Sequence, residues 1–172
     1  DNTDNGSIPR EIEHVDYTFS NFIVGSSNEF AYKACMAVID RPAVLYNPLF
    51  FHGASGLGKT HLSTAIARVV TERGYDVFYN SAVGMISDFE SRRFGNGVAS
   101  ATTDDTSAYT ECDLLIIDDL GTEVVNQFTL SCLYHVINTR LNLQKPTIIS
   151  TNLTPSELRK LYSDRISSRL TG

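Results

Sequence analysis

The stretch Gly53-Ala54-Ser55-Gly56-Leu57-Gly58-Lys59-Thr60 decides the fold of this chain. It satisfies the phosphate-loop pattern Gly-x4-Gly-Lys-Thr and lies between an expected strand, 49–52, and an expected helix, 59–73. Its glycines let successive backbone N–H groups point into one concavity, and the start of the helix adds partial positive charge there. We expect Lys59 to meet the outer phosphates and Thr60 to offer its hydroxyl to Mg²⁺. The motif therefore predicts a site for ATP with Mg²⁺.

On both sides of this loop, short apolar runs alternate with segments of helical periodicity. Continuous apolar runs predict buried strands at 49–52, 76–80, 114–117 and 147–150. Helical spacing of apolar residues predicts helices at 28–40, 59–73, 81–94, 128–141 and 154–162, with Asn28 and Thr154 as N-caps. Such strands separated by helices are typical of a parallel sheet that helices cover on both faces. The expected fold is an α/β P-loop domain.

Composition limits the alternatives. The chain has 172 residues, of which 42% are hydrophobic and 20% charged, and its net charge is −6. These values exclude a disordered or collagen-like chain, and the apolar runs fall far short of the roughly 18 residues that a membrane span needs. We therefore expect one cytoplasmic domain over 18–172 after a flexible acidic tail, 1–17, and no membrane partner. The cysteines at 35, 112 and 132 lack metal or disulfide spacing and are expected to be buried free thiols.

Two further strand ends carry polar residues. The run 114–117 is followed by Asp118 and Asp119, and the run 147–150 is followed by Asn152. Because parallel strands present their carboxyl ends to the ligand, we expect Asp118 to orient Mg²⁺ and Asp119 to polarise the attacking water. Asn152 is expected to sense the γ-phosphate or to position that water. The alternatives are that Asp119 caps the following segment and that Asn152 is a turn residue.

In this order and spacing, the phosphate loop, the acidic pair and the strand before Asn152 resemble the AAA+ ATPases. Two branches of that superfamily share the similarity. Residues 19–32 and 46–62 look like the DnaA family of bacterial replication initiators, whereas 112–123, 145–153 and 162–170 look like the DnaC/DnaI helicase loaders. The expected fold is thus an AAA+ core, and the chain stops before the helical lid that initiators carry.

The resemblance implies roles for individual residues. It places Ile23, Val24, Gly25 and Asn28 at the adenine, and it makes Arg169 an arginine finger that acts on the ATP of a neighbouring subunit, with Arg165 as the alternative. An arginine that acts in trans implies an oligomer that forms with nucleotide. The contacts expected around the phosphates are Gly53, Ser55, Gly56, Leu57, Gly58, Lys59, Thr60 and His61, with Thr60 and Asp118 at the metal.

The sequence departs from the initiator pattern after the acidic pair. Initiators carry basic residues there that are associated with single-strand binding, but 121–128 contains Glu123 and no Lys or Arg. Arg92 and Arg93, with the polar loop 95–106, are the remaining candidates for a DNA face, and a basic pair at a helix end is also common on solvated surfaces.

Together these patterns predict an ATPase of replication initiation that helps to load the replicative helicase or to open the origin. It would bind ATP or ADP, oligomerise with nucleotide and contact single-stranded DNA. Two alternatives stay open. One is a transposition helper ATPase that binds duplex DNA, and the other is a nucleotide-switched adaptor that does not hydrolyse ATP.

Overall fold

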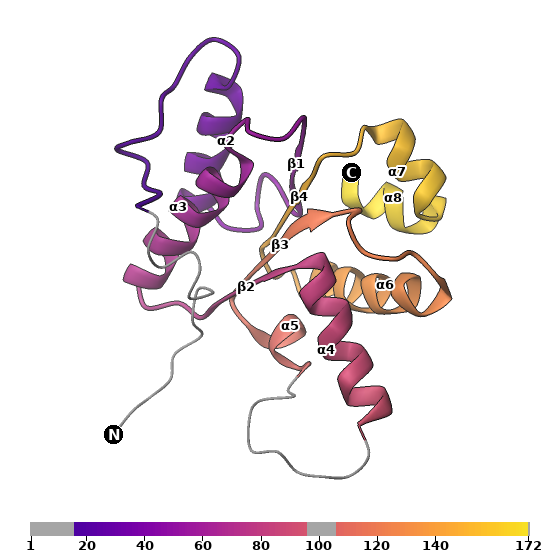
Figure 1. Cartoon of the computed structure of the whole chain (residues 1–172). Coiled ribbons are helices and arrows are strands. Elements are labelled where there is room, and N and C mark those ends of the chain that lie inside the picture. The colour runs from indigo at the N-terminus through magenta and orange to yellow at the C-terminus, as the bar shows by residue number, and fades with distance from the viewer. Residues whose placement is uncertain (1–15, 96–105, 172) are drawn as a thin grey trace.

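The structure, a computed structural model, describes residues 16–95 and 106–171 (Figure 1). Most of the acidic tail expected at 1–17 and nearly all of the polar loop expected at 95–106 lie outside these residues. Within the described ranges, no helix is both long and apolar enough to cross a membrane.

Four strands form one parallel sheet with the order β1-β4-β3-β2. Their bounds are β1 (Leu49–His52), β2 (Val77–Ser81), β3 (Leu114–Leu120) and β4 (Thr147–Thr151). The parallel sheet confirms the prediction, and three of the four strands begin and end within one residue of it. The strand expected at 114–117 is longer than predicted, because its acidic pair continues the strand. β4 separates β3 from β1, so the acidic strand does not pair directly with the strand of the phosphate loop.

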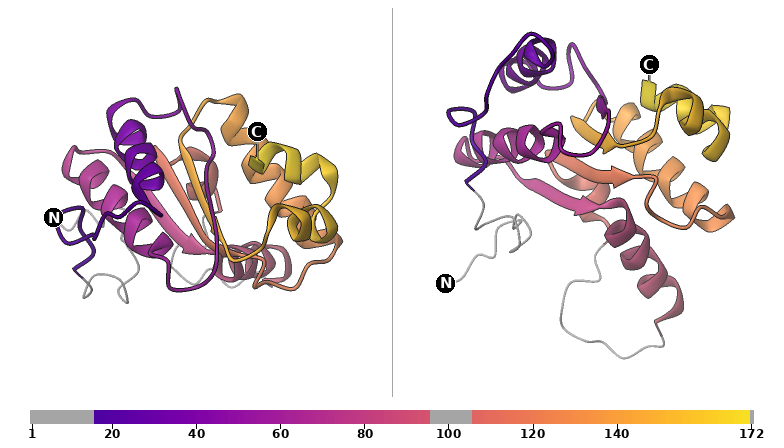
Figure 2. Two further views of the ribbon diagram at one scale, coloured as in Figure 1. Left: turned by 90° about the horizontal axis from the view of Figure 1, so that it is seen from above. Right: turned by 45° about the horizontal axis from the view of Figure 1, so that its top comes forward.

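Helices cover both faces of the sheet, as the continuous apolar runs predicted (Figure 2). One face carries α2 (Glu29–Asp40) and α3 (Lys59–Glu72). The other carries α4 (Ala82–Phe94), α5 (Ala108–Glu111), α6 (Gln127–Asn142), α7 (Pro155–Leu161) and α8 (Asp164–Thr171). The short helices α5 and α8 were not predicted. The other five begin and end within one residue of their predicted bounds.

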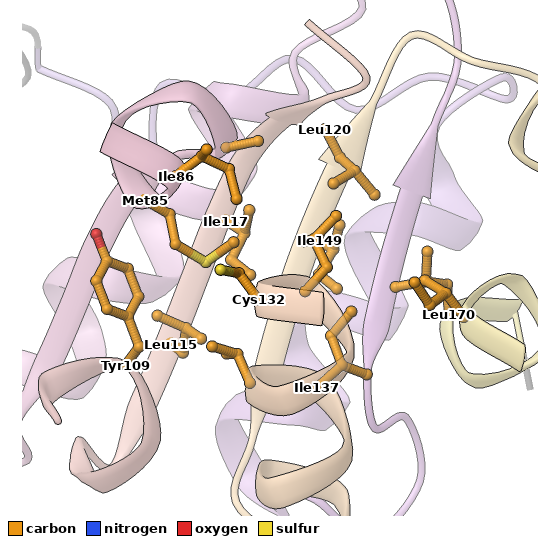
Figure 3. Close-up of a cluster of buried hydrophobic side chains, with 14 of the residues drawn as sticks. Met85, Ile86, Tyr109, Leu115, Ile117, Leu120, Cys132, Ile137, Ile149 and Leu170 are labelled. Carbon is orange, nitrogen blue, oxygen red and sulfur yellow. The ribbon is translucent and has the colours of Figure 1, made fainter. Parts of the chain in front are cut away.

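The central strands alternate their side chains between two cores. Leu115, Ile117 and Ile149 pack with Met85 of α4 and Ile137 of α6 (Figure 3). The intervening residues Leu114, Ile116 and Ile148 are also almost fully buried, on the side of α2 and α3. Because both faces are covered, the runs 114–117 and 148–149 are apolar at every position and lack the alternation of a half-exposed sheet. The three cysteines are free and buried, as expected.

Helix caps agree with the sequence pattern at one predicted start and differ at another. Thr154 and Glu157 form a reciprocal capping box at the start of α7, as predicted. Asn28 occupies the N-cap position of α2, as predicted, but its side chain makes no capping hydrogen bond there. Its side-chain amide instead forms hydrogen bonds with the backbone of Gly25 and Ile23, which precede the helix.

Candidate functional site

The phosphate loop, residues 53–58, connects β1 to α3 (Figure 1). Gly53, Gly56 and Gly58 have positive φ angles of 151°, 80° and 86°. This backbone conformation is open to glycine and costs other residues roughly 1–2 kcal/mol. At Gly58 the space is also closed, because a Cβ there would lie 2.9 Å from Cε2 of Phe22. Conformation and space therefore both require glycine at position 58.

Lys59 opens α3 and folds back over the loop. Its Nζ donates to the carbonyl oxygens of Gly53 at 2.7 Å and Ala54 at 2.8 Å. No side chain caps this helix start in the part of the chain that the structure describes, so the N–H groups of the first turn have no capping acceptor. The ammonium group and the helix start thus meet at one concavity, which suits an anion such as a phosphate.

Thr60 links the loop to the acidic strand. Its hydroxyl donates to Oδ2 of Asp118 at 3.1 Å, although 58 residues separate the two in sequence. This contact arises because β3 and α3 meet at the carboxyl edge of the sheet, where the predicted Mg²⁺ residues were expected to come together.

Asp118 is only 8% exposed, and its carboxylate lies among neutral donors. Oδ2 also accepts from the hydroxyl of Tyr79 at 2.7 Å, and Oδ1 accepts from the hydroxyl of Ser150 and from the backbone N–H of Asp119 at 3.1 Å. Burial, and then the charge of Asp118, raise the pKa of Tyr79, so its hydroxyl keeps its proton and remains a donor. These hydrogen bonds allow a carboxylate to stay in the strand and explain why β3 extends past Ile117.

The oxygen donors around Asp118 fit a small hard cation. A carboxylate and a threonine hydroxyl are ligands that Mg²⁺ accepts, and this ion usually completes its shell with water and phosphate oxygens. Within residues 16–95 and 106–171, no cluster of three or more His, Cys, Asp or Glu side chains could hold a metal by itself. The residues present therefore suit Mg²⁺ that arrives with a nucleotide.

Asp119 differs from its neighbour in exposure and conformation. Its backbone is left-handed, with φ of 54°, at a register shift between Ile117 and Leu120. Its N–H also donates to the Ser150 hydroxyl at 3.0 Å. Partial burial, and then the charge of Asp118, raise the pKa of its carboxyl, while the charge of Lys59 lowers it. The strained backbone turns this exposed carboxylate out of the strand at the edge where the phosphate loop lies.

Asn152 is exposed and lies just beyond the end of β4. Because β4 is the strand between β1 and β3, Asn152 lies at the same edge of the sheet as the phosphate loop and the acidic pair.

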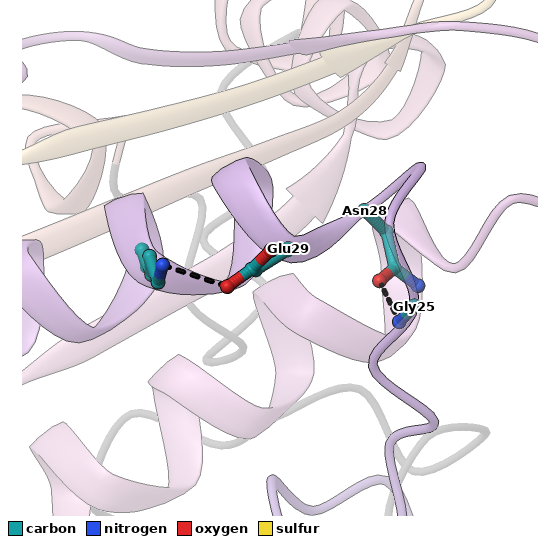
Figure 4. Close-up of polar contacts among 4 residues, drawn as sticks. Gly25, Asn28 and Glu29 are labelled. Carbon is teal, nitrogen blue, oxygen red and sulfur yellow. Dashed lines mark hydrogen bonds and ion pairs between the residues drawn. The ribbon is translucent and has the colours of Figure 1, made fainter.

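The segment expected at the adenine is held in a turn by the side chain of Asn28 (Figure 4). Oδ1 of Asn28 accepts from the N–H of Gly25 at 2.8 Å, and Nδ2 of Asn28 donates to the carbonyl oxygen of Ile23 at 2.9 Å. Ile23 and Val24 remain 87% and 44% exposed. This turn presents apolar side chains to solvent, as a contact surface for a planar base requires.

His61 attaches the chain before that turn to α3. Its Nε2 lies 2.7 Å from the carbonyl oxygen of Thr18, and its ring packs 4.7 Å from Tyr17 and 5.1 Å from Phe22, measured between centroids. Phe22 also covers Gly58. The expected adenine segment is therefore anchored at the phosphate loop. His61 contributes to this anchor, whereas the sequence had placed it only among the phosphate contacts.

Arg169 lies apart from these residues, on α8. Its Nε donates to Oδ1 of Asn138 at 3.1 Å, and its Nη1 donates to the carbonyl oxygen of Arg165 at 2.7 Å. The guanidinium carbons of Arg165 and Arg169 lie 4.2 Å and 5.0 Å from the ring centroid of Tyr134. Both arginines thus pack against α6 of their own subunit.

Two neighbours of Asp118 were missed by sequence reasoning. Tyr79 lies within β2 and Ser150 within β4, and each follows an apolar run that marks it only as part of a strand. The position of Ser150 two residues before Asn152 offered a signal, because it lies near the same strand end. Nothing in the sequence singled out Tyr79.

Comparison with known proteins agrees with this geometry. The model of the bacterial DnaA ATPase domain matches residues 14–172. The chain is 34% identical over 167 residues to the chromosomal replication initiator protein DnaA of Aliarcobacter butzleri (strain RM4018). The aligned region covers 97% of this chain and 37% of that protein. The chain thus spans little more than a third of that relative.

Solved structures show the same fold. A replication initiator DnaA bound to AMPPCP and single-stranded DNA matches with a TM-score of 0.80 and 34% identity, over 91% of this chain and 47% of that one. The DnaC helicase loader matches with a TM-score of 0.74 over 88% of this chain and 89% of that one, and its 19% identity shows a common fold alone. With the phosphate loop and the acidic strand in place, the chain belongs to the family of bacterial DnaA ATPase domains and has the AAA+ fold.

Proposed function

We propose that this chain is an ATP-binding and ATP-hydrolysing AAA+ domain that acts in the initiation of DNA replication, in origin opening or helicase loading. The observation that carries the proposal is the 3.1 Å contact between the Thr60 hydroxyl and the buried Asp118 carboxylate. It joins the phosphate loop to a carboxylate that has no cationic partner among its hydrogen bonds. Membership of the DnaA ATPase-domain family supports the biological process.

Nucleotide binding uses both ends of the site. Lys59 and the loop amides hold the phosphates, while Ile23, Val24 and the turn closed by Asn28 receive the base. Thr60 and Asp118 would hold Mg²⁺, which would supply positive charge to the outer phosphates. Thr60 can turn from Asp118 to the ion because a hydroxyl rotates freely.

Hydrolysis requires a water molecule aligned with the γ-phosphate. Asp119 polarises this water with its exposed carboxylate, and Asn152 orients it from the neighbouring strand end. The charge of Lys59 supports the ionised form of Asp119, against the burial and the charge of Asp118 that oppose it.

Arg169 completes the site of a neighbouring subunit. Since it lies on α8 and packs on α6, it can serve ATP only by presentation to another copy of the chain. Turnover therefore depends on an oligomer, and a positive charge that arrives with the neighbour stabilises the transition state.

Single-stranded DNA binds where α4 ends and α6 begins. The guanidinium carbon of Arg93 lies 5.3 Å from the ring centroid of Phe94 and 5.1 Å from that of Phe128, and Phe94 is 70% exposed. Cationic and aromatic groups together suit a phosphate backbone and stacked bases. Arg92 contributes less, because its guanidinium donates to the Thr106 hydroxyl. A solved DnaA relative bound to single-stranded DNA supports single-stranded DNA as the partner.

The remaining partners follow from the process. We assign a cytoplasmic location and a contact with the replicative helicase, which membership of the DnaA ATPase-domain family supports.

Fluorescence anisotropy with labelled single- and double-stranded oligonucleotides tests this function. We expect the domain to bind single strands in the presence of ATP and Mg²⁺ and to bind them more weakly with ADP. The Lys59→Ala variant should no longer bind them. Arg93→Ala should lower the salt slope of binding by about 0.7, the value for one phosphate contact on a single strand. Arg159→Ala, at an exposed site on α7, is the matched control.

Two outcomes would contradict the proposal. A preference for duplex DNA would favour a transposition helper instead. ATP binding without turnover at any protein concentration would indicate a nucleotide-switched adaptor.

A further inference from the structure

The carboxylate of Glu123 is buried outside the nucleotide site. It connects β3, the strand of the acidic pair, to α8, the helix of Arg165 and Arg169. Glu123 follows β3 by three residues and is only 8% exposed. Its Oε2 accepts from the N–H of Gly121 at 2.8 Å, and its Oε1 accepts from the hydroxyl of Tyr162. Both of these partners are neutral. A carboxylate is expensive to bury in this way, so these hydrogen bonds must be maintained for the segment to stay in place.

The segment that holds Glu123 is closely coupled to the candidate active site. Gly121 lies two residues after Asp119 and has φ of 102°. A Cβ at Gly121 would lie 2.5 Å from Cδ1 of Leu153, the residue after Asn152. The carbonyl oxygen of Leu120 also accepts from the Thr151 hydroxyl at 2.5 Å. The backbone around Gly121 therefore lies beside Leu153 and Thr151, the two residues that flank Asn152 in the sequence.

At the other end of the connection, Tyr162 ends α7 and lies two residues before the start of α8. It is 1% exposed and lies between α7 and α8, and its N–H donates to the carbonyl oxygen of Leu158 at 2.8 Å. Burial, and then the hydrogen bond to Glu123, raise the pKa of Tyr162, so the hydroxyl stays protonated as a donor. α8 begins two residues later and carries Arg165 and Arg169.

α8 is a helix of eight residues that carries both arginines. Ile166 and Leu170 bury one face of it in the core, and Arg165 and Arg169 point from the other face toward Tyr134. A shift of its first turn therefore moves both arginines. A displacement of about 1 Å in a positioning group can lower a reaction rate by roughly 100-fold.

We propose that Glu123 and Tyr162 are positioning residues that link the strand of Asp118 and Asp119 to the arginines of α8, so that the arginine offered to a neighbouring subunit is set by the acidic strand of its own subunit. This inference rests on the proposed function, in which Arg169 acts in trans. Neither residue touches the nucleotide. Their effect passes through the placement of α8.

The test compares two buried tyrosines. Tyr162→Phe removes the hydroxyl that binds Glu123. Tyr109→Phe is the matched control, because Tyr109 is also 1% exposed, also donates to a carboxylate, Asp88, and packs in the same core without a contact to α8 that the structure records. We expect ATP turnover to fall at least tenfold in Tyr162→Phe, with unchanged ATP affinity, and to fall less than twofold in Tyr109→Phe.

Mixing of subunits separates a misplaced arginine from general damage. Asp119→Asn subunits keep Arg169 and the Glu123–Tyr162 contact but cannot activate water. When they are mixed one to one with Tyr162→Phe subunits, half of the sites keep Asp119 and half of those meet a correctly placed arginine, so turnover should rise to about a quarter of the wild-type value. Arg169→Ala should be rescued in the same way. Rescue of Arg169→Ala without rescue of Tyr162→Phe would overturn the positioning role, whereas no rescue of Arg169→Ala would overturn the proposed trans arginine instead.

Hydrogen exchange gives a readout that does not depend on turnover. In Tyr162→Phe and in Glu123→Gln, backbone amides of 164–171 should exchange at least fivefold faster than in the wild type, while those of 59–72 remain unchanged. Equal exchange of 164–171 in Tyr162→Phe and Tyr109→Phe would overturn the inference even if the chain proved inactive as an ATPase.

Discussion

The two ends of the sheet each bury one charged side chain, and they satisfy it in opposite ways. At the carboxyl edge, Asp118 is 8% exposed and accepts from three side-chain hydroxyls and one backbone N–H. At the amino edge, Arg140 of α6 is fully buried and its Nε donates to the Thr147 hydroxyl at 2.9 Å. Its two terminal nitrogens donate to the backbone carbonyls of Tyr109, Thr110, Cys112, Asp113 and Pro146.

The two buried charges differ in whether their hydrogen-bond partners can reorient. Backbone carbonyls before β3 and β4 are fixed by the sheet, so Arg140 is held permanently and cannot serve a ligand. Hydroxyl groups rotate, so those of Thr60, Tyr79 and Ser150 can turn as a cation approaches Asp118. A buried charge with fixed partners indicates a structural role, and a buried charge with rotatable partners indicates a functional one.

Arg140→Met should have the largest effect. It removes the guanidinium donor from five carbonyl oxygens, of which those of Cys112 and Pro146 keep another donor, and we expect the free energy of unfolding to fall by about 2–3 kcal/mol, the scale of losing hydrogen bonds to a charged group and leaving buried acceptors unsatisfied. Urea denaturation measures this change, with the exposed Arg159→Met as control. If the variant is too unstable to purify, Arg140→Lys should still lower the urea midpoint clearly. A loss below about 1 kcal/mol in either variant would contradict a structural role for the guanidinium.

Asp118→Asn should change the effect of Mg²⁺ on ATP affinity much more than it changes stability. The amide oxygen can still accept from the donors on one side, and its NH2 can donate to hydroxyls that rotate, so we expect the free energy of unfolding to change by less than about 1 kcal/mol. The gain in ATP affinity that Mg²⁺ provides should fall at least tenfold, which is about 1.4 kcal/mol. Calorimetric titration of ATP with and without Mg²⁺ measures this. Asp113→Asn, at the amino edge, should leave the Mg²⁺ effect intact, and an equal loss in both variants would remove the distinction between the two edges.

Tyr79→Phe should have the smallest effect of the three. It removes one hydroxyl donor from Asp118 and should lower the free energy of unfolding by about 1 kcal/mol, while the Mg²⁺ effect on ATP affinity stays within threefold. Tyr75→Phe is the control, because Tyr75 is 56% exposed. A loss of the Mg²⁺ effect as large as that of Asp118→Asn would mean that the donors of Asp118 cannot be exchanged, as for Arg140.

Much of this molecule could be predicted from patterns that are local in the sequence. The phosphate loop, four strands and five helices are each indicated within 4–16 consecutive residues, by glycine spacing, apolar runs or helical periodicity. The acidic pair and Asn152 were expected at strand ends for the same reason. α8 was missed because it lacks a start signal like the capping box and proline that mark the still shorter α7, and α5 because it has only four residues.

Other features depend on contacts between distant segments. Asn28 looked like a helix cap, but its amide closes the turn at Ile23 instead, since that turn supplies two backbone partners. β3 was expected to end at Ile117, because nothing in the sequence revealed the hydroxyls that make Asp118 tolerable inside the sheet.

By itself the sequence determined the phosphate loop, the parallel sheet and the identity of the carboxylates at its edge, because these follow from residue type and short-range spacing. Only the tertiary structure decided which charges have fixed partners and which have exchangeable ones. Arg140 reads in the sequence as one more basic residue at the end of an amphipathic helix, and Glu123 as a surface acid in a polar turn. Their burial results from strands and helices that lie 27–39 residues away along the chain, and hydrogen bonds across such separations are formed by the fold.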